Sequence, residues 1–380
     1  MNNNVEYGIL NHIEVPYKVY GKGFEYEVVG QFVSAMILDC TIRGALMPDA
    51  HLGYSLPIGG VVSTRGIIFP SWVGYDIGCG VCAIKTTFKY SDVVDNKKEI
   101  FDSILKAVPV GKEHNKLSYA WKDSDNIPKT KTVSDLIRDG AMKQIGTLGG
   151  GNHFIEIGID EDTNVWVVIH SGSRNLGWKT AQYYMKTASG TNKAKEGHYG
   201  FPIDSEQGKN YIMDLNYCLE FALKNRTVML ERIEVEISNI IKGSFDWESL
   251  INRTHNHAEI KGDEVIHRKG ATHAEDGMYG VVPGNMLDGS FIVRGKGNVE
   301  SLCSSSHGAG RKLSRKEAKR VLDFEKFKEE MNKAGIEANV SQSTLDESRD
   351  AYKDIFKVME DQKDLIDIVH YIEPIINVKG

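Results

Sequence analysis

The stretch VWVVIHSGSR, residues 165–174, joins an apolar run to a histidine and a polar turn. Five consecutive apolar residues ending at Ile169 are typical of a strand that is buried inside a sheet. Such a strand would present His170 at its tip. The SGSR segment that begins after it supplies hydroxyl groups and a guanidinium, which suit a phosphate. The stretch therefore predicts a buried strand that carries a histidine to a site for an anionic ligand.

Other segments predict the rest of the fold. Short β-type runs occur at 59–64, 81–86 and 375–378, and isoleucines and leucines recur at helical spacing from about residue 210 to 242. Capping boxes at 314–317 and 344–347 predict two further helices, the first running to the Ala334-Gly335 stop. No repeat or low-complexity linker divides the chain. The expected fold class is α+β: a single catalytic domain over 1–380, with mixed sheets and an embedded helical layer at about 205–245.

Composition excludes some classes of protein. The chain has 380 residues, a net charge of −6 and five cysteines. An odd, irregularly spaced set of cysteines does not favour a disulfide framework. No apolar run of about 18 residues predicts a membrane span, and the polar N-terminus lacks a signal-peptide core, so a cytoplasmic protein is expected. The charge does not favour nucleic-acid binding, although a local basic groove suffices for it. Residues 311–320 are such a basic stretch, unless they are simply a solvated helix start.

Histidine, aspartate and cysteine recur in short, mostly glycine-rich clusters. The clusters are PDAHLG (48–53), GYDIGCG (74–80), GGGNHFIE (149–156), HSGSR (170–174), HN (255–256) and SHGAGR (306–311). These side chains bind divalent metals of intermediate softness, and glycine leaves backbone N–H groups free for anions. The clusters together predict a metal site with a phosphate nearby, inside an enzyme.

Asp76 and Cys79 lie three residues apart in one glycine-rich turn, which can point both side chains at one ion. A thiolate favours Mn²⁺ or Zn²⁺ over Mg²⁺, and one sulfur can bridge two ions. Asn152 can donate to phosphate, His153 can ligate metal, and Glu156 can orient a ligand. The competing interpretations are a buried cysteine beside a capping aspartate, and a CxxC motif formed by Cys79 and Cys82.

His307 has mostly small residues around it, SSS before and GAG after. The open space suits a nucleophile that a bulky phosphate approaches, although a surface turn is the plainer interpretation. PGNM (283–286) and RGKGN (294–298) look like phosphate or nucleotide loops. Neither matches a Walker A loop, and no Rossmann fingerprint occurs, so any nucleotide site is of another kind.

Seven motifs, in this order along the chain, resemble the RtcB family of RNA ligases. They are PDAH (48–51), VGYDIGCG (73–80), GTLGGGNHF (146–154), HSGSR (170–174), RKGAT (268–272), SHGAGR (306–311) and the closing Lys379-Gly380. The resemblance implies that family's own fold and a ligase dependent on GTP and Mn²⁺, with two ions expected. His307 would carry GMP, and the substrates would be RNA 3′-phosphate or 2′,3′-cyclic phosphate ends and 5′-hydroxyl ends.

The resemblance also implies the residues of the site. The metal ligands would be Asp76, Cys79, His153, His170 and His255. The nucleotide would be bound by Asn152, Glu156, Asn256, Pro283, Gly284, Asn285, Met286, Ser290, His307, Gly308, Ala309, Gly310 and Lys379, with Lys379 at the guanine. The role would be RNA repair or tRNA splicing, and an activating or release-factor-like protein partner stays open.

Two positions depart from the pattern of the family. Asn285 stands where many relatives are expected to have serine, and His257 adds an imidazole beside the His-Asn pair. Both bear on the RNA preference more than on the core chemistry. The alternative enzyme is a metal-dependent phosphohydrolase acting on RNA ends, which needs no covalent nucleotide. A non-enzymatic RNA-binding protein would be expected to lose the ligand set, which is present here.

Overall fold

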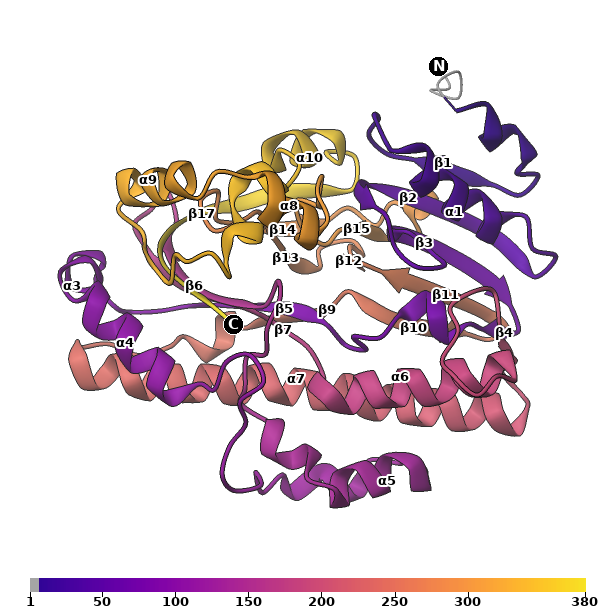
Figure 1. Cartoon of the computed structure of the whole chain (residues 1–380), viewed down its shortest axis with the longest axis horizontal. Coiled ribbons are helices and arrows are strands. Elements are labelled where there is room, and N and C mark those ends of the chain that lie inside the picture. Colours follow the sequence, from indigo (N-terminus) through magenta and orange to yellow (C-terminus); the bar gives the residue numbers. More distant parts are fainter. Residues whose placement is uncertain (1–6) are drawn as a thin grey trace.

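Two large β-sheets and a long helix beneath them make up the framework of the computed structural model, which describes residues 7–380 (Figure 1). The five-stranded sheet has the order β1 (Tyr17–Val19), β2 (Thr41–His51), β3 (Ile58–Arg65), β11 (Glu264–Lys269) and β10 (Asn256–Lys261). Only the β1–β2 pair is parallel, and β2–β3, β3–β11 and β11–β10 are antiparallel. The cluster at 48–53 therefore lies at the end of β2.

The eight-stranded sheet is built from distant parts of the chain. Its order is β13 (Tyr279–Pro283), β14 (Ser290–Gly295), β17 (Ile366–Lys379), β6 (Phe154–Ile159), β7 (Val165–Ser171), β5 (Gly80–Lys85) and β9 (Ile251–Thr254), with β16 (Glu337–Ala338) paired to β17. β17 pairs with β14 through its first half and with β6 through its second half. Two small pairs complete the strands: β12 (Ala271–His273) with β15 (Ser304–Ser306), and β4 (Ile67–Ile68) with β8 (Phe201–Pro202).

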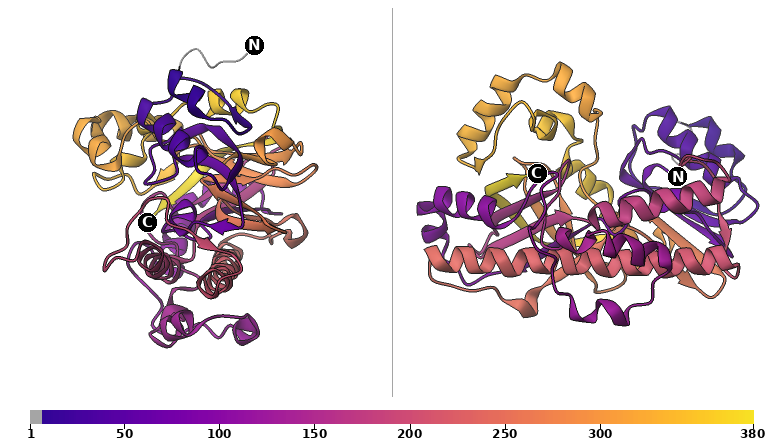
Figure 2. Two further views of the ribbon diagram at one scale, coloured as in Figure 1. Left: turned by 90° about the vertical axis from the view of Figure 1, so that its right-hand side faces the viewer. Right: turned by 60° about the horizontal axis from the view of Figure 1, so that its bottom comes forward.

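Helices cover both sides of the sheets. The indigo and orange helices in Figure 2 lie on the side opposite α7, which runs the length of the molecule beside α6. The helices are α1 (Tyr26–Met36), α2 (Pro70–Val73), α3 (Tyr90–Asp95), α4 (Lys97–Ala107), α5 (Lys131–Arg138), α6 (Arg174–Ser189), α7 (Glu206–Ile240), α8 (Arg315–Val321), α9 (Phe324–Ala334) and α10 (Ile355–Asp361). Within residues 7–380, no helix is long and apolar enough to cross a membrane.

The long helix α7 joins two parts of the core. Its C-terminal half packs Met229, Ile233 and Ile237 against β6 and β7 of the eight-stranded sheet. Its N-terminal half packs in a second cluster that includes α6, with Leu215 and Phe221 among its buried residues. The predicted helical layer is confirmed, and the helix begins slightly earlier than the periodicity indicated because Ser205 caps it by accepting from the N–H of Gly208.

Most of the predicted elements are confirmed, and the α+β class with them. The runs at 59–64 and 81–86 are β3 and β5, and the run at 165–169 is in β7, with His170 near its end. The predicted closing strand is real but starts earlier, at Ile366.

Two helix predictions near the C-terminal end are wrong. The helix expected from 314 to 334 is broken into α8 and α9, because Asp323 leaves the helical conformation and caps α9 by accepting from the N–H groups of Glu325 and Lys326. The capping box at 344–347 gives only a 3₁₀ turn, Leu345–Glu347, and Thr344 makes no capping hydrogen bond. The carboxylates of Asp346 and Glu347 bind basic side chains instead.

Candidate active site

A thiol, a carboxylate and three imidazoles converge where β5 and β6 begin and β7 and β9 end. The turn between α2 and β5 supplies Asp76 and Cys79, the segment before β6 supplies His153, and β7 supplies His170. Cys79 Sγ lies 3.2 Å from His170 Nε2 and 3.5 Å from His153 Nε2. Asp76 Oδ2 lies 3.1 Å from His153 Nε2. The ring centroids of His170 and His255 are 5.1 Å apart.

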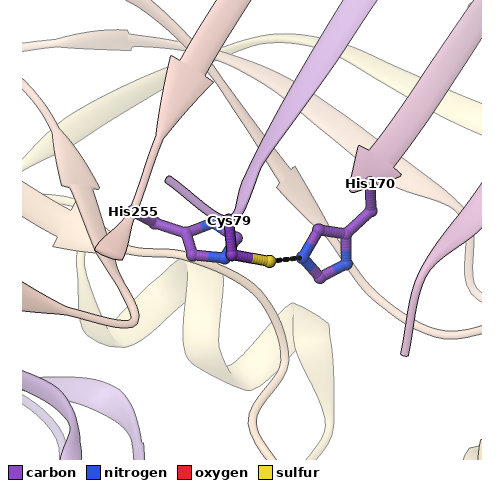
Figure 3. A group of neighbouring side chains, drawn as sticks. All are labelled: Cys79, His170 and His255. Carbon is purple, nitrogen blue, oxygen red and sulfur yellow. Dashed lines mark hydrogen bonds between the residues drawn. The ribbon is translucent and has the colours of Figure 1, made fainter. Parts of the chain in front are cut away.

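These side chains form two overlapping groups that share Cys79. Ligand atoms of Cys79, His170 and His255 lie within 4.8 Å of one another, and so do those of Asp76, Cys79 and His153. Figure 3 shows the sulfur of Cys79 pointing at His170, with His255 beside it. A donor set of one sulfur, one carboxylate and neutral imidazoles fits a divalent ion of intermediate softness. The sequence prediction that these five residues lie together agrees with the geometry.

The protonation of the group suits metal binding. Burial, followed by the charge of His153 or His307, lowers the pKa values of His170 and His255 well below the usual range, so both rings are neutral. Leu148 O lies 2.9 Å from Nδ1 of His153, a contact that holds the ring with Nε2 toward Asp76 and Cys79. Burial and the neighbouring Asp76 raise the pKa of the Cys79 thiol, an effect that a bound cation would oppose.

The CxxC interpretation is excluded by the positions of its two thiols. Cys79 lies in the turn among the histidines, whereas Cys82 lies on β5 within the apolar cluster that also holds Ile84 and Ile155. The side chains of the two cysteines thus have different environments, and Cys82 belongs to the core.

Backbone approach explains why glycines surround the metal ligands. Gly78 has a φ of +74°, and a Cβ there would lie 2.8 Å from Cβ of Ala222 on α7. A Cβ on Gly80 would collide with the carbonyl oxygen of Arg253 on β9. The turn that holds Asp76 and Cys79 is therefore pressed between α7 and β9, where only glycine fits.

Two buried polar residues of α7 hold this turn and its neighbours. Arg226 Nη1 donates to the carbonyls of Gly78 at 3.0 Å and Ser171 at 2.7 Å. The amide of Asn225 accepts from the N–H of Gly146 and donates to the carbonyl of Gly172. α7 is thus a scaffold, as predicted, but it also fixes the backbone of three glycine-rich segments.

His307 lies directly beside this group, with its ring centroid 4.8 Å from that of His255. Its Nδ1 is 2.6 Å from Oδ2 of Asp49, a carboxyl that is completely buried at the end of β2. Burial alone would raise the pKa of Asp49, but the charge and contact of His307 lower it. Because a carboxylate only accepts, a proton on Nδ1 would face Asp49 and leave Nε2 with its lone pair, although the two atoms are not aligned for a hydrogen bond in this structure.

A cavity opens beside His307 and His170. Its walls include eleven of the residues predicted to bind a nucleotide: Asn152, Glu156, Pro283, Gly284, Asn285, Met286, His307, Gly308, Ala309, Gly310 and Lys379. Asn152 makes no hydrogen bond to any other residue of the described chain, so its amide is available to a ligand. The cavity therefore brings the candidate nucleophile together with most of the residues predicted to bind a nucleotide.

The far wall of the cavity is a buried network of charges around Glu347. Lys379 Nζ lies 2.6 Å from Oε2 of Glu347, and Arg311 and Arg315 also pair with this carboxylate. Burial opposes ionisation of Glu347, but Lys379 and the two arginines lower its pKa to about 2. Asn339 accepts from the backbone N–H of Lys379 and donates to its carbonyl, so the lysine is docked at both its ends.

Glu156 faces the same cavity from β6. Its carboxylate accepts from Ser290 Oγ at 2.8 Å and from the amide of Asn377 at 3.4 Å. Burial raises the pKa of Glu156 to about 7, because the hydrogen bonds and Lys379 offset only part of the desolvation. Glu156 can therefore exchange a proton near neutral pH.

Some predicted residues do not line the cavity. Ser290 lies behind Glu156, and the side chain of Asn256 is bonded to the backbone, donating to Asp76 O and accepting from Gly270 N. The RGKGN loop is also elsewhere, since Lys296 pairs with Asp367 on the outer part of β17. Asn285, the departure from the family pattern, accepts from the N–H groups of Leu287 and Asp288 and so stabilises its own loop.

Sequence reasoning did not identify three residues that shape the site. Asp49 lies in the PDAH motif, but its contact with His307 spans 258 residues. The sequence pattern assigns Glu347 to a helix cap and gives no role to Arg226, which falls within the predicted long helix. A buried acid or base in an otherwise apolar helix face was the available signal for Arg226.

Comparisons with known proteins agree with this geometry. The chain matches the family model described as tRNA-splicing ligase RtcB over residues 31–380. It is 33% identical to the RNA-splicing ligase RtcB of Escherichia coli K12 over 411 residues, which cover 99% of this chain and all of that protein. It is 29% identical to the tRNA-splicing ligase RtcB of Aeropyrum pernix, over 83% of each chain. An RtcB homologue of Entamoeba dispar is also 29% identical, over 93% of this chain and 82% of its own.

Proposed function

This chain belongs to the RtcB family of RNA ligases, and on that premise we propose that it seals RNA through a guanylylated histidine. The substrates in this proposal are an RNA end with a 3′-phosphate or 2′,3′-cyclic phosphate and an RNA end with a 5′-hydroxyl. GTP supplies the nucleotide, and His307 carries it. The observation that carries the proposal is the contact between His307 and the buried Asp49, at the mouth of a cavity beside a potential metal group.

His307 is suited to be the nucleophile. Asp49 faces Nδ1 at 2.6 Å, so the lone pair of Nε2 is left for the attack. In the first step this nitrogen forms a bond to the α-phosphorus of GTP, and the bond from that phosphorus to the bridging oxygen of pyrophosphate breaks. As positive charge develops on the imidazole, Asp49 stabilises it. The flanking GAG segment leaves space for the phosphate.

Two further displacements complete the sequence. An oxygen of the RNA 3′-phosphate attacks the phosphorus on His307, the P–N bond breaks, and the RNA now ends in a 3′-diphosphate joined to guanosine. The 5′-hydroxyl oxygen of the second strand then attacks the RNA 3′-phosphorus and loses its proton, and GMP leaves. A 2′,3′-cyclic phosphate is first opened by water to the 3′-phosphate.

The cavity offers groups that suit a guanine nucleotide. Lys379 can donate to O6 or N7 of guanine, the acceptor pair that lysine and arginine recognise in this base. Glu156 in its ionised form can accept from guanine N–H groups, and Asn152 can donate to a phosphate oxygen. Arg311 lines the same cavity and adds positive charge.

The metal in this proposal is Mn²⁺, and Asp76, Cys79, His153, His170 and His255 are the residues that would hold two such ions. Bound there, such ions neutralise phosphate charge and favour displacement at phosphorus. The chain contributes the imidazoles and the buried thiol of Cys79. Arg226 keeps the turn in place by donating a hydrogen bond to the carbonyl of Gly78.

The test is covalent labelling with α-³²P-GTP and Mn²⁺, followed by acid treatment. The wild-type chain should retain an acid-labile label, and His307→Ala should retain none while binding Mn²⁺ as the wild type does. His12→Gln is the control and should take the label as the wild type does, since this imidazole is exposed at Gly8–His12 and does not line the cavity. A wild-type chain that releases phosphate from RNA ends but takes no label would be a phosphohydrolase.

A further inference from the structure

Three aromatic rings form a row whose middle member, Tyr75, belongs to the glycine-rich turn of the metal ligands. Tyr75 precedes Asp76, and its ring lies 5.8 Å from that of Tyr54 and 6.4 Å from that of Trp178. Tyr54 comes from the loop between β2 and β3, and Trp178 from α6. Tyr54 is 66% exposed and Trp178 45% exposed. Such large rings seldom remain exposed together without a ligand to cover them.

The backbone under the exposed tyrosine is held rigidly. Gln31 of α1 donates to the carbonyls of Gly53 and Tyr54 and accepts from the N–H of Gly53. The hydroxyl of the next residue, Ser55, donates to Ser71 O. The loop is thus fixed on both sides of Tyr54 while the ring stays open, which is the arrangement of a preorganised contact.

The other two rings are also oriented. The hydroxyl of Tyr75 donates to Glu196 at 2.5 Å, and Trp178 projects from α6 one helical turn after Arg174. Within residues 7–380, the indole N–H of Trp178 has no hydrogen-bond partner, so it can donate to a ligand. The buried Lys269 lies with its Nζ 5.7 Å from the Tyr54 ring centroid and adds positive charge beneath the row.

We propose that Tyr54, Tyr75 and Trp178 form a stacking surface for unpaired bases of the RNA strand whose end enters the metal site. This inference rests on the proposed ligase function and extends it to the binding of the strand. Every base has a π-face, so a row of aromatic rings binds single-stranded RNA with little sequence preference. The middle ring belongs to Tyr75, the neighbour of Asp76 in the chain, and this closeness to the metal turn favours a strand that ends at the reacting phosphorus over a protein partner.

The experiment measures binding of fluorescent ten-nucleotide single strands in the absence of GTP. Each strand is made with all its bases and, separately, with abasic residues at the three positions nearest the reacting end. One arm uses strands with a 3′-phosphate and the other strands with a 5′-hydroxyl, which identifies the strand that the row binds. The proteins are the wild type, Tyr54→Leu, Trp178→Leu, Trp178→Phe and Tyr90→Leu.

Trp178→Leu and Tyr54→Leu should each weaken binding of the complete strand by about 5-fold or more in one arm, the range for one stacked base. Binding of the matching abasic strand should change little, and Trp178→Phe should recover most of the affinity. Tyr90 is exposed on α3, away from the site, and Tyr90→Leu should bind as the wild type does. Wild-type affinity in both leucine variants would overturn the inference, and so would equal losses for complete and abasic strands.

Failure of the proposed function is measured separately. Labelling of the wild type by GTP needs no RNA, whereas strand binding needs no GTP. A wild type that takes no GMP but shows the base-dependent losses would contradict the ligase proposal and support the stacking surface. The reverse result would contradict the stacking surface alone.

Discussion

At the scale of single residues, the side chains around His307 determine how its imidazole is held. Nδ1 faces the completely buried Asp49. The ring of His255 meets the His307 ring edge-on, and the ring of His51 is stacked with it. Oδ1 of Asp49 has no hydrogen-bond partner within the described chain, so His307 is the main counterpart of this carboxyl. The close approach of the two side chains therefore fixes which edge of the ring faces the carboxylate.

The first prediction concerns this pair. Asp49→Asn should reduce the rate of GMP attachment by about 10²-fold or more, because an amide neither fixes the Nδ1–H tautomer nor stabilises the charged imidazole. Single-turnover labelling with GTP measures the rate. Asp39→Asn, an exposed position after α1, is the control and should react at the wild-type rate. A wild-type rate in Asp49→Asn would mean that the contact is only structural.

The second prediction concerns the two cysteines that share a CxxC spacing. Cys79→Ser should lose Mn²⁺ affinity, since its sulfur belongs to both groups of potential ligands, and Cys82→Ser should keep it. Cys82→Ser should instead lose stability, because a hydroxyl is placed in an apolar core. Metal titration and thermal unfolding separate the two effects. Equal losses of metal affinity would contradict the assignment of Cys79.

The sequence could predict the short segments that carry the metal ligands. The ligands sit in short segments whose glycines signal close backbone approach, so each segment was recognisable alone. The contacts of Asp49 with His307 and of Glu347 with Lys379 were not, since they span 258 and 32 residues. A local sequence pattern does not predict contacts between residues that are far apart in the chain.

At the scale of elements, the strand β17 carries one wall of the cavity. The second half of β17 pairs with β6. At its last residue, the backbone N–H of Lys379 donates to the side chain of Asn339. The capping box at 344–347 was mispredicted for a related reason. Its Glu347 pairs with Lys379 of β17, with Arg311 and with Arg315 at the start of α8. The carboxylate that would cap a helix therefore belongs to the cavity wall.

The third prediction compares two changes at the end of β17. Lys379→Met removes the ammonium but keeps the backbone bonds to Asn339, whereas deletion of Lys379 and Gly380 removes both. Each should weaken the use of GTP by about 1–3 kcal/mol and reduce the preference over ATP, the range for one good base contact. Labelling rates at low GTP and ATP measure this. Wild-type rates in both variants would exclude Lys379 from the nucleotide site.

At the scale of the whole molecule, buried charges couple the site to stability. The raised pKa of Glu156, about 7 against a usual 4.5, means that the folded protein holds a proton that the unfolded chain has released. At pH values between these two pKa values, the folded state binds more protons than the unfolded chain. The free energy of unfolding therefore falls as pH rises through this range.

The fourth prediction tests this linkage. Between pH 4.5 and 7, the wild type should lose up to about 3 kcal/mol of stability through Glu156, and Glu156→Gln should remove this part of the slope. Urea unfolding at several pH values measures it. Glu373→Gln, an exposed position on β17, is the control and should retain the wild-type slope. A Glu156→Gln variant with an unchanged slope would show that Glu156 ionises normally.

The position of β17 in the eight-stranded sheet also has a consequence for how the chain folds. The strand is synthesised after all its sheet neighbours, yet it lies between β14 and β6 and not at an edge. Until residues 366–379 leave the ribosome, β6-β7-β5-β9 and β13-β14 each present an unpaired hydrogen-bonding edge. Such late, long-range pairing folds slowly, and open edges invite association with other chains. A nascent chain of this protein is therefore expected to depend on chaperones until that strand is inserted.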